Sequence, residues 1–184
     1  SFLILSGWQR IKPVDGNTLP SFGTQITYSP SSRITFNSST FIGTDSPNQR
    51  RLMRYFHDFY STFKLSSKLA ATIGFDIGME QKSKGSSTFN TWFNSTAIMR
   101  YTPTTNTAIA VRGEYFDDRN SVLLSSTSPN GFRTWAFSAN FDWNITKNFL
   151  WRVEARSLIN KDNIFTRQDG TITNNNTIFT TALA

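Results

Sequence analysis

The chain has 184 residues, of which 38% are hydrophobic and 15% aromatic, and it carries a formal net charge of +7 with no cysteine. Disordered chains are poor in aromatic residues, so the aromatic content argues against disorder. The absence of cysteine excludes a disulfide framework and a thiolate metal site. Apart from Arg50, Arg51 and Arg54, the basic residues are scattered singly, so we expect no nucleic-acid-binding surface.

No stretch approaches the ~20 consecutive apolar residues of a membrane-spanning helix. Apolar and polar residues instead alternate with a period of two along almost the whole chain, which predicts β-strands and no helix. Their lengths centre near the ~9–11 residues that a tilted strand needs to cross a bilayer. The expected strands are Phe2–Ile11, Ser21–Ser29, Arg33–Thr44, Arg54–Leu65, Lys68–Glu80, Phe89–Tyr101, Thr107–Phe116, Arg133–Ile145, Phe149–Leu158 and Thr177–Ala184.

The connections between these strands alternate between tight and long, and both kinds are rich in turn-forming residues. The expected tight connections are Ser29–Ser32, Ser66–Ser67, Thr102–Asn106 and Thr146–Asn148. The expected long ones are Lys12–Pro20, Asp45–Met53, Gln81–Thr88, Asp117–Phe132 and Ile159–Asn176. This alternation predicts an up-and-down meander whose two rims face different surroundings, as in outer-membrane barrels.

The apolar face of each strand could cover the core of a soluble sandwich or barrel, or it could face lipid. Aromatic residues at the ends of the apolar faces favour lipid, because Trp and Tyr concentrate at membrane interfaces. Trp135 and Trp143 are eight residues apart on one face, which is roughly 20 Å of height at ~40° tilt and comparable to a ~25 Å apolar band. The candidate aromatic girdle is Tyr28, Tyr101, Trp135, Trp143 and Trp151.

Ionised residues of both signs occupy mid-strand positions on the polar faces, which a water-filled lumen accepts and a small soluble barrel does not. The candidate lumen-facing residues are Arg112, Glu114, Arg152, Glu154, Arg156, Asp142, Asp76, Asp58 and Arg100. On their two strands, the Arg and Glu residues share a face, so they could set a transverse field across a pore or close into a salt-bridge ladder. An excess of positive charge in the lumen predicts a mild preference for anions.

Catalysis finds little support in the sequence. His57 is the only histidine, and it falls on the apolar side of its strand. No cluster of His, Cys and carboxylates with ligand spacing surrounds it. Adjacent carboxylates such as Asp117 and Asp118 point to opposite faces of a strand, so we expect this pair to be solvated at the edge of a loop rather than to act as an acid–base couple. We therefore expect no enzyme, no metal and no cofactor.

Several segments resemble one family. The run Arg112–Asp118, preceded by Arg100–Pro103, is similar to the β-barrel porin-2 family, the OmpL-like outer-membrane porins. The Gly7–Arg10 segment with Asn17 in the following loop, and the late strand Phe149–Arg156, are similar to segments of the same family. The resemblance implies the outer membrane of a Gram-negative bacterium and a role in the passage of small solutes. Because family members are longer, it also implies that N-terminal strands and the extreme C-terminus lie outside residues 1–184.

We therefore expect an all-β fold, an antiparallel up-and-down transmembrane β-barrel with about ten strands visible, forming one domain over residues 1–184 that is part of a larger barrel. The expected function is passive passage of small hydrophilic solutes or ions, with membrane lipid and those solutes as partners. Two alternatives stay open. One is a structural or adhesion barrel with a plugged lumen and partner-binding loops. The other is a soluble carbohydrate-binding β-domain. The sequence leaves the oligomeric state and the pore size open.

Overall fold

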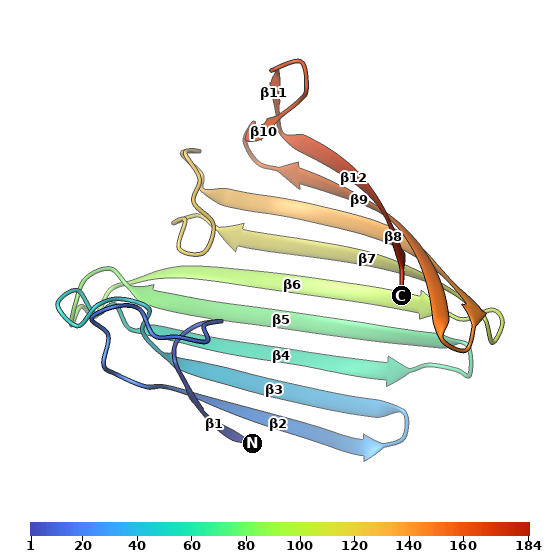
Figure 1. Ribbon diagram of the computed structural model, residues 1–184, viewed down its shortest axis with the longest axis horizontal. Coiled ribbons are helices and arrows are strands. Elements are labelled where there is room, and N and C mark those ends of the chain that lie inside the picture. Colours follow the sequence, from blue (N-terminus) through green and yellow to red (C-terminus); the bar gives the residue numbers. More distant parts are fainter.

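A computed structural model describes residues 1–184 as an all-β chain whose main sheet has ten antiparallel strands in the order of the sequence (Figure 1). The strands are β1 (Phe2–Leu5), β2 (Ser21–Ser31), β3 (Ile34–Gly43), β4 (Arg54–Lys64), β5 (Leu69–Gln81), β6 (Phe89–Tyr101), β7 (Thr107–Asp118), β8 (Phe132–Thr146), β9 (Phe149–Asn160) and β12 (Asn175–Leu183). The predicted antiparallel up-and-down architecture is confirmed. The sheet is open, and β1 and β12 form its two edges.

None of the structure's elements is a helix of the length and apolarity needed to traverse a bilayer.

The tight and long connections separate to opposite ends of the sheet, as the sequence predicts. The tight connections follow β2, β4, β6 and β8 and meet at one rim, on the right in Figure 1; we call this the tight-turn rim. The longer connections follow β1, β3, β5, β7 and β9 and form the opposite, long-connection rim. The ladder from β2 to β9 runs strand by strand between the two rims with only two local irregularities.

The two faces of the sheet differ in chemistry, and β8 shows the rule. Trp135 and Phe137 are 52% and 49% exposed on one face, whereas Ala136 and Asp142 on the other are 5% and 3% exposed. We call the first the outer face and the second the inner face. Only 21 of 184 residues are buried, so the apolar side chains of this protein cover its outside rather than fill a core, which is the arrangement of a lipid-facing strand.

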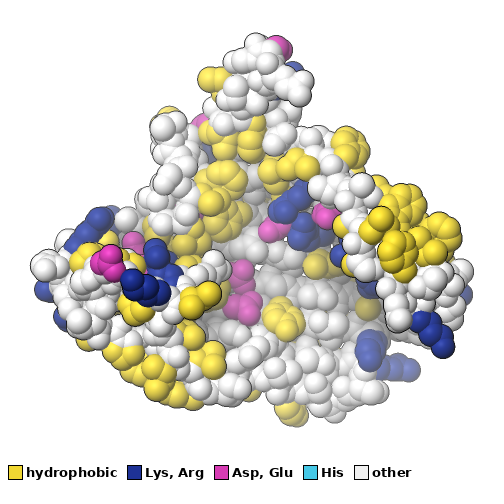
Figure 2. All heavy atoms as spheres, viewed as in Figure 1, with side chains coloured by type: hydrophobic (Ala, Val, Ile, Leu, Met, Phe, Trp, Pro, Cys, Tyr) yellow, Lys and Arg dark blue, Asp and Glu magenta, His cyan; other side chains and the backbone are white.

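Figure 2 shows the molecule hollowed at its centre, with basic and acidic side chains in the hollow and hydrophobic side chains gathered toward the edges of the view. The buried hydrophobic side chains are few: Phe41, Leu52, Trp92, Ala108 and Ala136. The packing that exists inside is therefore local, and the hollow is lined mainly by polar groups.

The expected first strand, Phe2–Ile11, is wrong at its end, because β1 stops at Leu5. Gly7 and Gln9 have φ values of +138° and +52°, which an extended strand does not allow. The chain from residue 6 leaves the sheet there and turns onto the inner face. A small hairpin of β10 (Phe165–Thr166) and β11 (Ile172–Thr173) lies within the expected last long connection and was not predicted.

Candidate functional site on the inner face

The structure brings the nine candidate lumen-facing residues to the inner face. They form two groups. Asp58 and Asp76 lie on β4 and β5, and the remaining seven lie on β6 to β9. We call the second group the charge ladder; its members are Arg100, Arg112, Glu114, Asp142, Arg152, Glu154 and Arg156.

The part of the charge ladder nearer the tight-turn rim is centred on Asp142. Arg152 binds this carboxylate with both ends of its fork, through Nε at 2.6 Å and Nη2 at 2.7 Å. Arg100 adds a third contact, with its Nη1 3.3 Å from Oδ2 of Asp142. The bidentate geometry fixes Arg152 because planar guanidinium and carboxylate groups match each other. Two cations thus share one carboxylate.

The part of the charge ladder further from the tight-turn rim joins β7 to β9. Arg156 Nη2 lies 3.0 Å from Oε2 of Glu114. Arg112 lies between Glu114 and Glu154, with nitrogen–oxygen distances of 3.7 and 3.5 Å. These distances exceed the usual range of charge-assisted hydrogen bonds, so Arg112 is held mainly by charge. The predicted neighbourhood of the Arg and Glu residues along the wall is therefore present as a set of ion pairs.

The cations of the charge ladder face the hollow more than its anions do. The arginine side chains are 47% (Arg100) and 45% (Arg152) exposed, against 4% for the Asp142 side chain between them. Arg156 is 36% exposed and its partner Glu114 is 20% exposed. Although the charges pair, the positive ends remain in contact with solvent. The surface that a solute would meet on β6 to β9 is consequently basic.

Asp58 and Asp76 present the opposite sign. They face each other directly across β4 and β5. Each accepts a long hydrogen bond from an amide: Asn37 Nδ2 lies 3.5 Å from Asp58 and Asn94 Nδ2 lies 3.5 Å from Asp76. Neither carboxylate has an ion pair with a Lys or Arg. The inner face is thus acidic in the middle of β4 and β5, and basic on β6 to β9.

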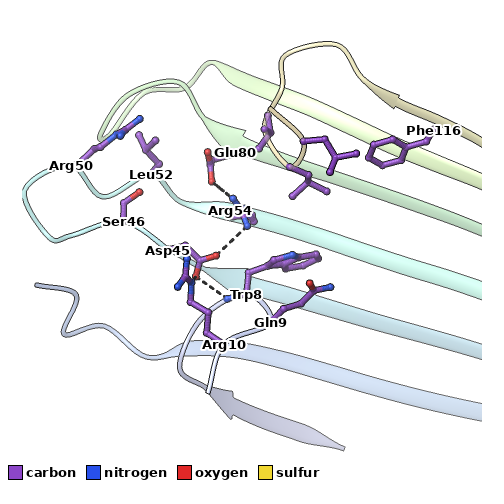
Figure 3. A pocket seen from close by; sticks show the side chains of 13 residues that line it. Trp8, Gln9, Arg10, Asp45, Ser46, Arg50, Leu52, Arg54, Glu80 and Phe116 are labelled. Carbon is purple, nitrogen blue, oxygen red and sulfur yellow. Dashed lines mark hydrogen bonds and ion pairs between the residues drawn. The ribbon is translucent and has the colours of Figure 1, made fainter. Parts of the chain in front are cut away.

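A second cluster, at the long-connection rim, is one that sequence reasoning did not include among the candidate sites (Figure 3). Arg54 at the start of β4 bridges two carboxylates, with Nη2 2.7 Å from Glu80 and Nη1 3.2 Å from Asp45. Its guanidinium carbon also lies 5.7 and 5.6 Å from the ring centroids of Trp8 and Trp92, within cation–π range. We call Trp8, Asp45, Arg54, Glu80 and Trp92 the rim cluster.

Trp8 belongs to the segment that follows β1, and it packs against three strands at once. Its ring centroid lies 5.1 Å from Phe41 on β3, 4.6 Å from Phe56 on β4 and 6.5 Å from Trp92 on β6. All three contacts are edge-to-face, the arrangement that aromatic quadrupoles favour. The segment after β1 is therefore anchored on the inner face rather than extended into solvent.

Polar bonds hold the rest of this segment. The backbone N–H of Trp8 donates to Asp45 Oδ1 at 2.9 Å, and Arg10 Nε lies 3.5 Å from the same oxygen. Further along, the side-chain amide of Asn17, which is buried, donates to the backbone carbonyl of Thr44 at 3.0 Å. The segment is fastened at both ends to the chain that follows β3.

The rim cluster borders an open cavity of about 750 Å³, and residues of the β7–β8 connection line its other side. The carboxylate of Asp118, which has no exposed surface, accepts backbone N–H bonds from Val122, Leu123 and Leu124 at 2.8 to 2.9 Å. These bonds turn the connection back so that its apolar tip lines the cavity together with Phe116. Two inward-folded segments thus narrow the hollow at the same rim.

One signal in the sequence could have located the rim cluster. Gly78 lies directly opposite Trp92 across β5 and β6, and a Cβ atom on Gly78 would come within 2.0 Å of the Trp92 ring. A glycine facing a tryptophan on the polar face of a strand indicates a large side chain lying flat on the wall. Without the pairing register, this match is invisible in the sequence.

The five candidate girdle residues all lie on the outer face. Tyr28, Tyr101, Trp143 and Trp151 are near the tight-turn rim, where the rings of Trp143 and Trp151 meet at 6.4 Å. Trp135 lies near the long-connection rim, where its ring centroid is 4.7 Å from that of Tyr115 and the two ring planes are tilted by 41°. Tyr115 lies directly beside Trp135 on the outer face, and the candidate aromatic girdle did not include it.

The chemistry that these groups can perform is binding and electrostatic guidance. His57 lies on the outer face, where its Nε2 is 2.9 Å from the hydroxyl of Ser38, and no nucleophile–base–carboxylate chain includes it. No group of three or more His, Cys, Asp or Glu side chains lies close enough to hold a metal ion.

Comparison with known proteins agrees with this geometry at the level of the family. No curated protein and no solved structure matches the chain. A family model described as "Putative beta-barrel porin-2, OmpL-like" matches residues 1–184, the whole chain. The antiparallel meander described above, with its apolar outer face and charged inner face, is consistent with a β-barrel porin. The chain belongs to this family of OmpL-like β-barrel porins.

Proposed function

We propose that this protein is a passive pore of the bacterial outer membrane that lets small hydrophilic solutes and ions pass along its inner face. The observation that carries the proposal is the sorting of side chains between the two faces. Exposed Trp135, Phe137 and Trp143 lie outside, whereas the ion-paired Arg112, Glu154 and their neighbours lie inside. A water-filled lumen is the surrounding in which such inward charges remain solvated. No catalytic step is part of this proposal.

The charge ladder supports a preference for anions within this function. Its four arginines outnumber its three carboxylates, and the arginine side chains are the more exposed members of each pair. A permeating anion would meet guanidinium groups that still have free N–H donors. The preference would be mild, because each arginine is partly neutralised by its partner and because Asp58 and Asp76 lie on the neighbouring wall.

Conductance in planar lipid bilayers tests the proposal. The full-length protein should open steady channels, and the reversal potential in a potassium chloride gradient should report anion preference. The double variant Arg100→Gln/Arg152→Gln should shift this potential toward cations, because it removes the two most exposed arginines of the ladder. The matched control Lys82→Gln/Lys84→Gln removes two charges from the β5–β6 connection, outside the ladder, and should shift it less. Cation selectivity of the unaltered protein would overturn the anion preference.

A structural or adhesion barrel is the second candidate, and the rim cluster is the observation that favours it, since Trp8 and the β7–β8 connection both fill space inside the sheet. Channels that remain closed under all voltages would support this second function and overturn the pore. The soluble carbohydrate-binding alternative is disfavoured by the outer face, because monomeric soluble proteins rarely expose a continuous apolar surface of this kind. Solubility of the folded protein without detergent would reinstate it.

A further inference from the structure

The outer face carries a group of cations at the long-connection rim, apart from the inner-face site. Asp117, at the end of β7, is 1% exposed and lies on the outer face. Arg119 binds it with Nε at 3.1 Å and Nη2 at 2.9 Å, and Arg133 binds it with Nε at 3.0 Å. Lys161 lies beside them, since its backbone N–H donates to the carbonyl of Arg133 at 2.9 Å. We call Asp117, Arg119, Arg133 and Lys161 the outer basic site.

The outer basic site keeps unused positive charge. Two arginines share one carboxylate, and Arg133 uses only its Nε in that contact, which leaves its two terminal nitrogens free of ion pairs. The Nζ of Lys161 donates only to the amide oxygen of Asn130 at 2.9 Å. Asp162 is the next carboxylate along the chain, and its oxygens already accept bonds from Ser128 and Asn130. Three cations thus face two carboxylates, Asp117 and Asp162, which leaves a net positive charge at the site.

Below these cations, toward the middle of the strands, the outer face is aromatic. A groove of about 280 Å³ is lined by Tyr115, Arg133, Trp135, Ile159, Asn160 and Lys161. Trp135 and Ile159, neighbours across β8 and β9, are 52% and 43% exposed. The groove therefore has a cationic end at the rim and an apolar floor that continues onto the lipid-facing surface.

A groove of this form matches an amphipathic anion. Guanidinium groups bind phosphate oxygens through pairs of parallel N–H donors, and an ammonium group adds a point charge. A free inorganic anion would leave the apolar floor exposed to water, whereas an acyl chain would cover Trp135 and Ile159. Asp117 acts as a positioning residue, because Arg119 and Arg133 both contact its Oδ2 oxygen and are thereby held next to each other.

We propose that the outer basic site binds the phosphate of a phosphorylated membrane lipid, whose acyl chain lies along Trp135 and Ile159. The lipid belongs to the leaflet at the long-connection rim. This site is separate from the lumen, so it does not depend on whether the protein conducts ions.

Native mass spectrometry of the full-length protein in detergent micelles tests this proposal, with bisphosphorylated lipid A as the probe. The unaltered protein should retain the lipid A, and monophosphorylated lipid A should bind more weakly. The double variant Arg133→Gln/Lys161→Gln should weaken binding about tenfold or more, since each lost contact is a charge-assisted hydrogen bond. The matched control is Lys82→Gln/Lys84→Gln, which removes two cations from the β5–β6 connection at the same rim, and it should bind as the unaltered protein does.

Two further variants separate lipid recognition from loss of fold. Arg133→Lys keeps the charge and loses the fork, so its affinity should fall between those of the unaltered protein and the double variant. Trp135→Ala should weaken binding of lipid A while leaving any binding of inorganic phosphate unchanged. Equal loss in the Lys82/Lys84 control, or equal binding of lipid A and inorganic phosphate, would overturn the proposal; the second result would assign the groove to a soluble anion.

Discussion

Arg54 at the long-connection rim and the cations of the tight-turn rim have opposite surroundings. At the long-connection rim, Arg54 is 9% exposed, and its guanidinium is enclosed by two carboxylates and two indole rings. At the tight-turn rim, four cations are exposed, none forms an ion pair, and no Asp or Glu lies in the turns. These cations are Arg33, Lys64, Lys68 and Lys147.

The difference teaches that charge in this protein has two separate uses. Where the segment after β1 is held against the inner face, Arg54 contacts Trp8 and its charge is neutralised locally by Asp45 and Glu80. In the tight turns, which backbone hydrogen bonds close, the cations are exposed and unpaired, so their field extends into the solvent. Substitution of Arg54 should therefore change mainly the stability of the fold, whereas substitution of the tight-turn cations should change mainly the ion selectivity.

The largest effect is expected at Arg54. Arg54→Met leaves Asp45 and Glu80 without their shared cation in a nearly buried place, and the loss of one partner from such a group costs about 3–5 kcal/mol. The variant should unfold at a lower temperature, followed by circular dichroism in detergent micelles. Because Trp8 loses its cation contact, the segment after β1 should also loosen and single-channel conductance should rise.

Lys64→Met is the matched control for Arg54. Lys64 lies at the other end of the same strand and is exposed without an ion pair, so its removal should change stability by no more than about 0.5 kcal/mol. Equal losses of stability at the two positions would show that the rims do not differ as described.

A smaller effect is expected where Gly78 admits the Trp92 ring. Gly78→Ala places a Cβ atom within 2.0 Å of that ring, and overpacking of this kind costs about 1–3 kcal/mol. The control Gly113→Ala lies on the outer face, where the nearest atom, on Phe137, is 3.8 Å away. Thermal unfolding should distinguish the two; a destabilised Gly113→Ala with an unaffected Gly78→Ala would contradict the packing described for the rim cluster.

At the tight-turn rim, the expected effect is on ions rather than on stability. Changing the four exposed cations together to Gln should leave the unfolding temperature nearly unchanged, because exposed unpaired charges contribute little to folding. The reversal potential at low salt should shift toward cations and should return toward that of the unaltered protein at ~1 M salt, where charges are screened within ~3 Å. A reversal potential that is insensitive to the four changes at low salt would contradict the second use of charge.

The smallest effect concerns pH at the long-connection rim. Hydrogen bonds from Ser128 and Asn130 hold the pKa of the Asp162 carboxyl below its ordinary value. A lowered pKa in the folded state means that these bonds stabilise the connection above the ordinary pKa and lose their effect as the pH falls through the lowered value. The amide resonance of Asn130 should therefore stay constant from pH 7 to about pH 4 and change below it. Asp162→Asn should abolish this change, and a transition near neutral pH would contradict the assignment.

Much of the fold could be predicted from the sequence because each strand carries its own two-residue period. In β8, the alternation of Trp135, Phe137 and Phe141 with Ser138 and Asp142 fixes both the strand and the sorting of its faces. Turn residues such as Pro103 and Asn148 mark where strands end. Local chemistry was sufficient for these features.

The inward segments could not be predicted in the same way. Phe2–Ile11 has the composition of one strand, yet it divides at Gly7 because Asp45, 37 residues away from Trp8, accepts the backbone N–H of Trp8. Likewise, Asp118 was expected to be solvated at a loop edge, and it is instead fully buried under three backbone N–H donors. Contacts between distant parts of the chain decide these places, and no local pattern encodes them.

The contacts of Trp8 also constrain the order in which the protein can assemble. Its ring touches side chains from β3, β4 and β6, so the surface on which it packs does not exist until the strands through residue 101 have paired. The docking of residues 6–20 is therefore a late folding event, and quenching of Trp8 fluorescence would time it during insertion into the bilayer.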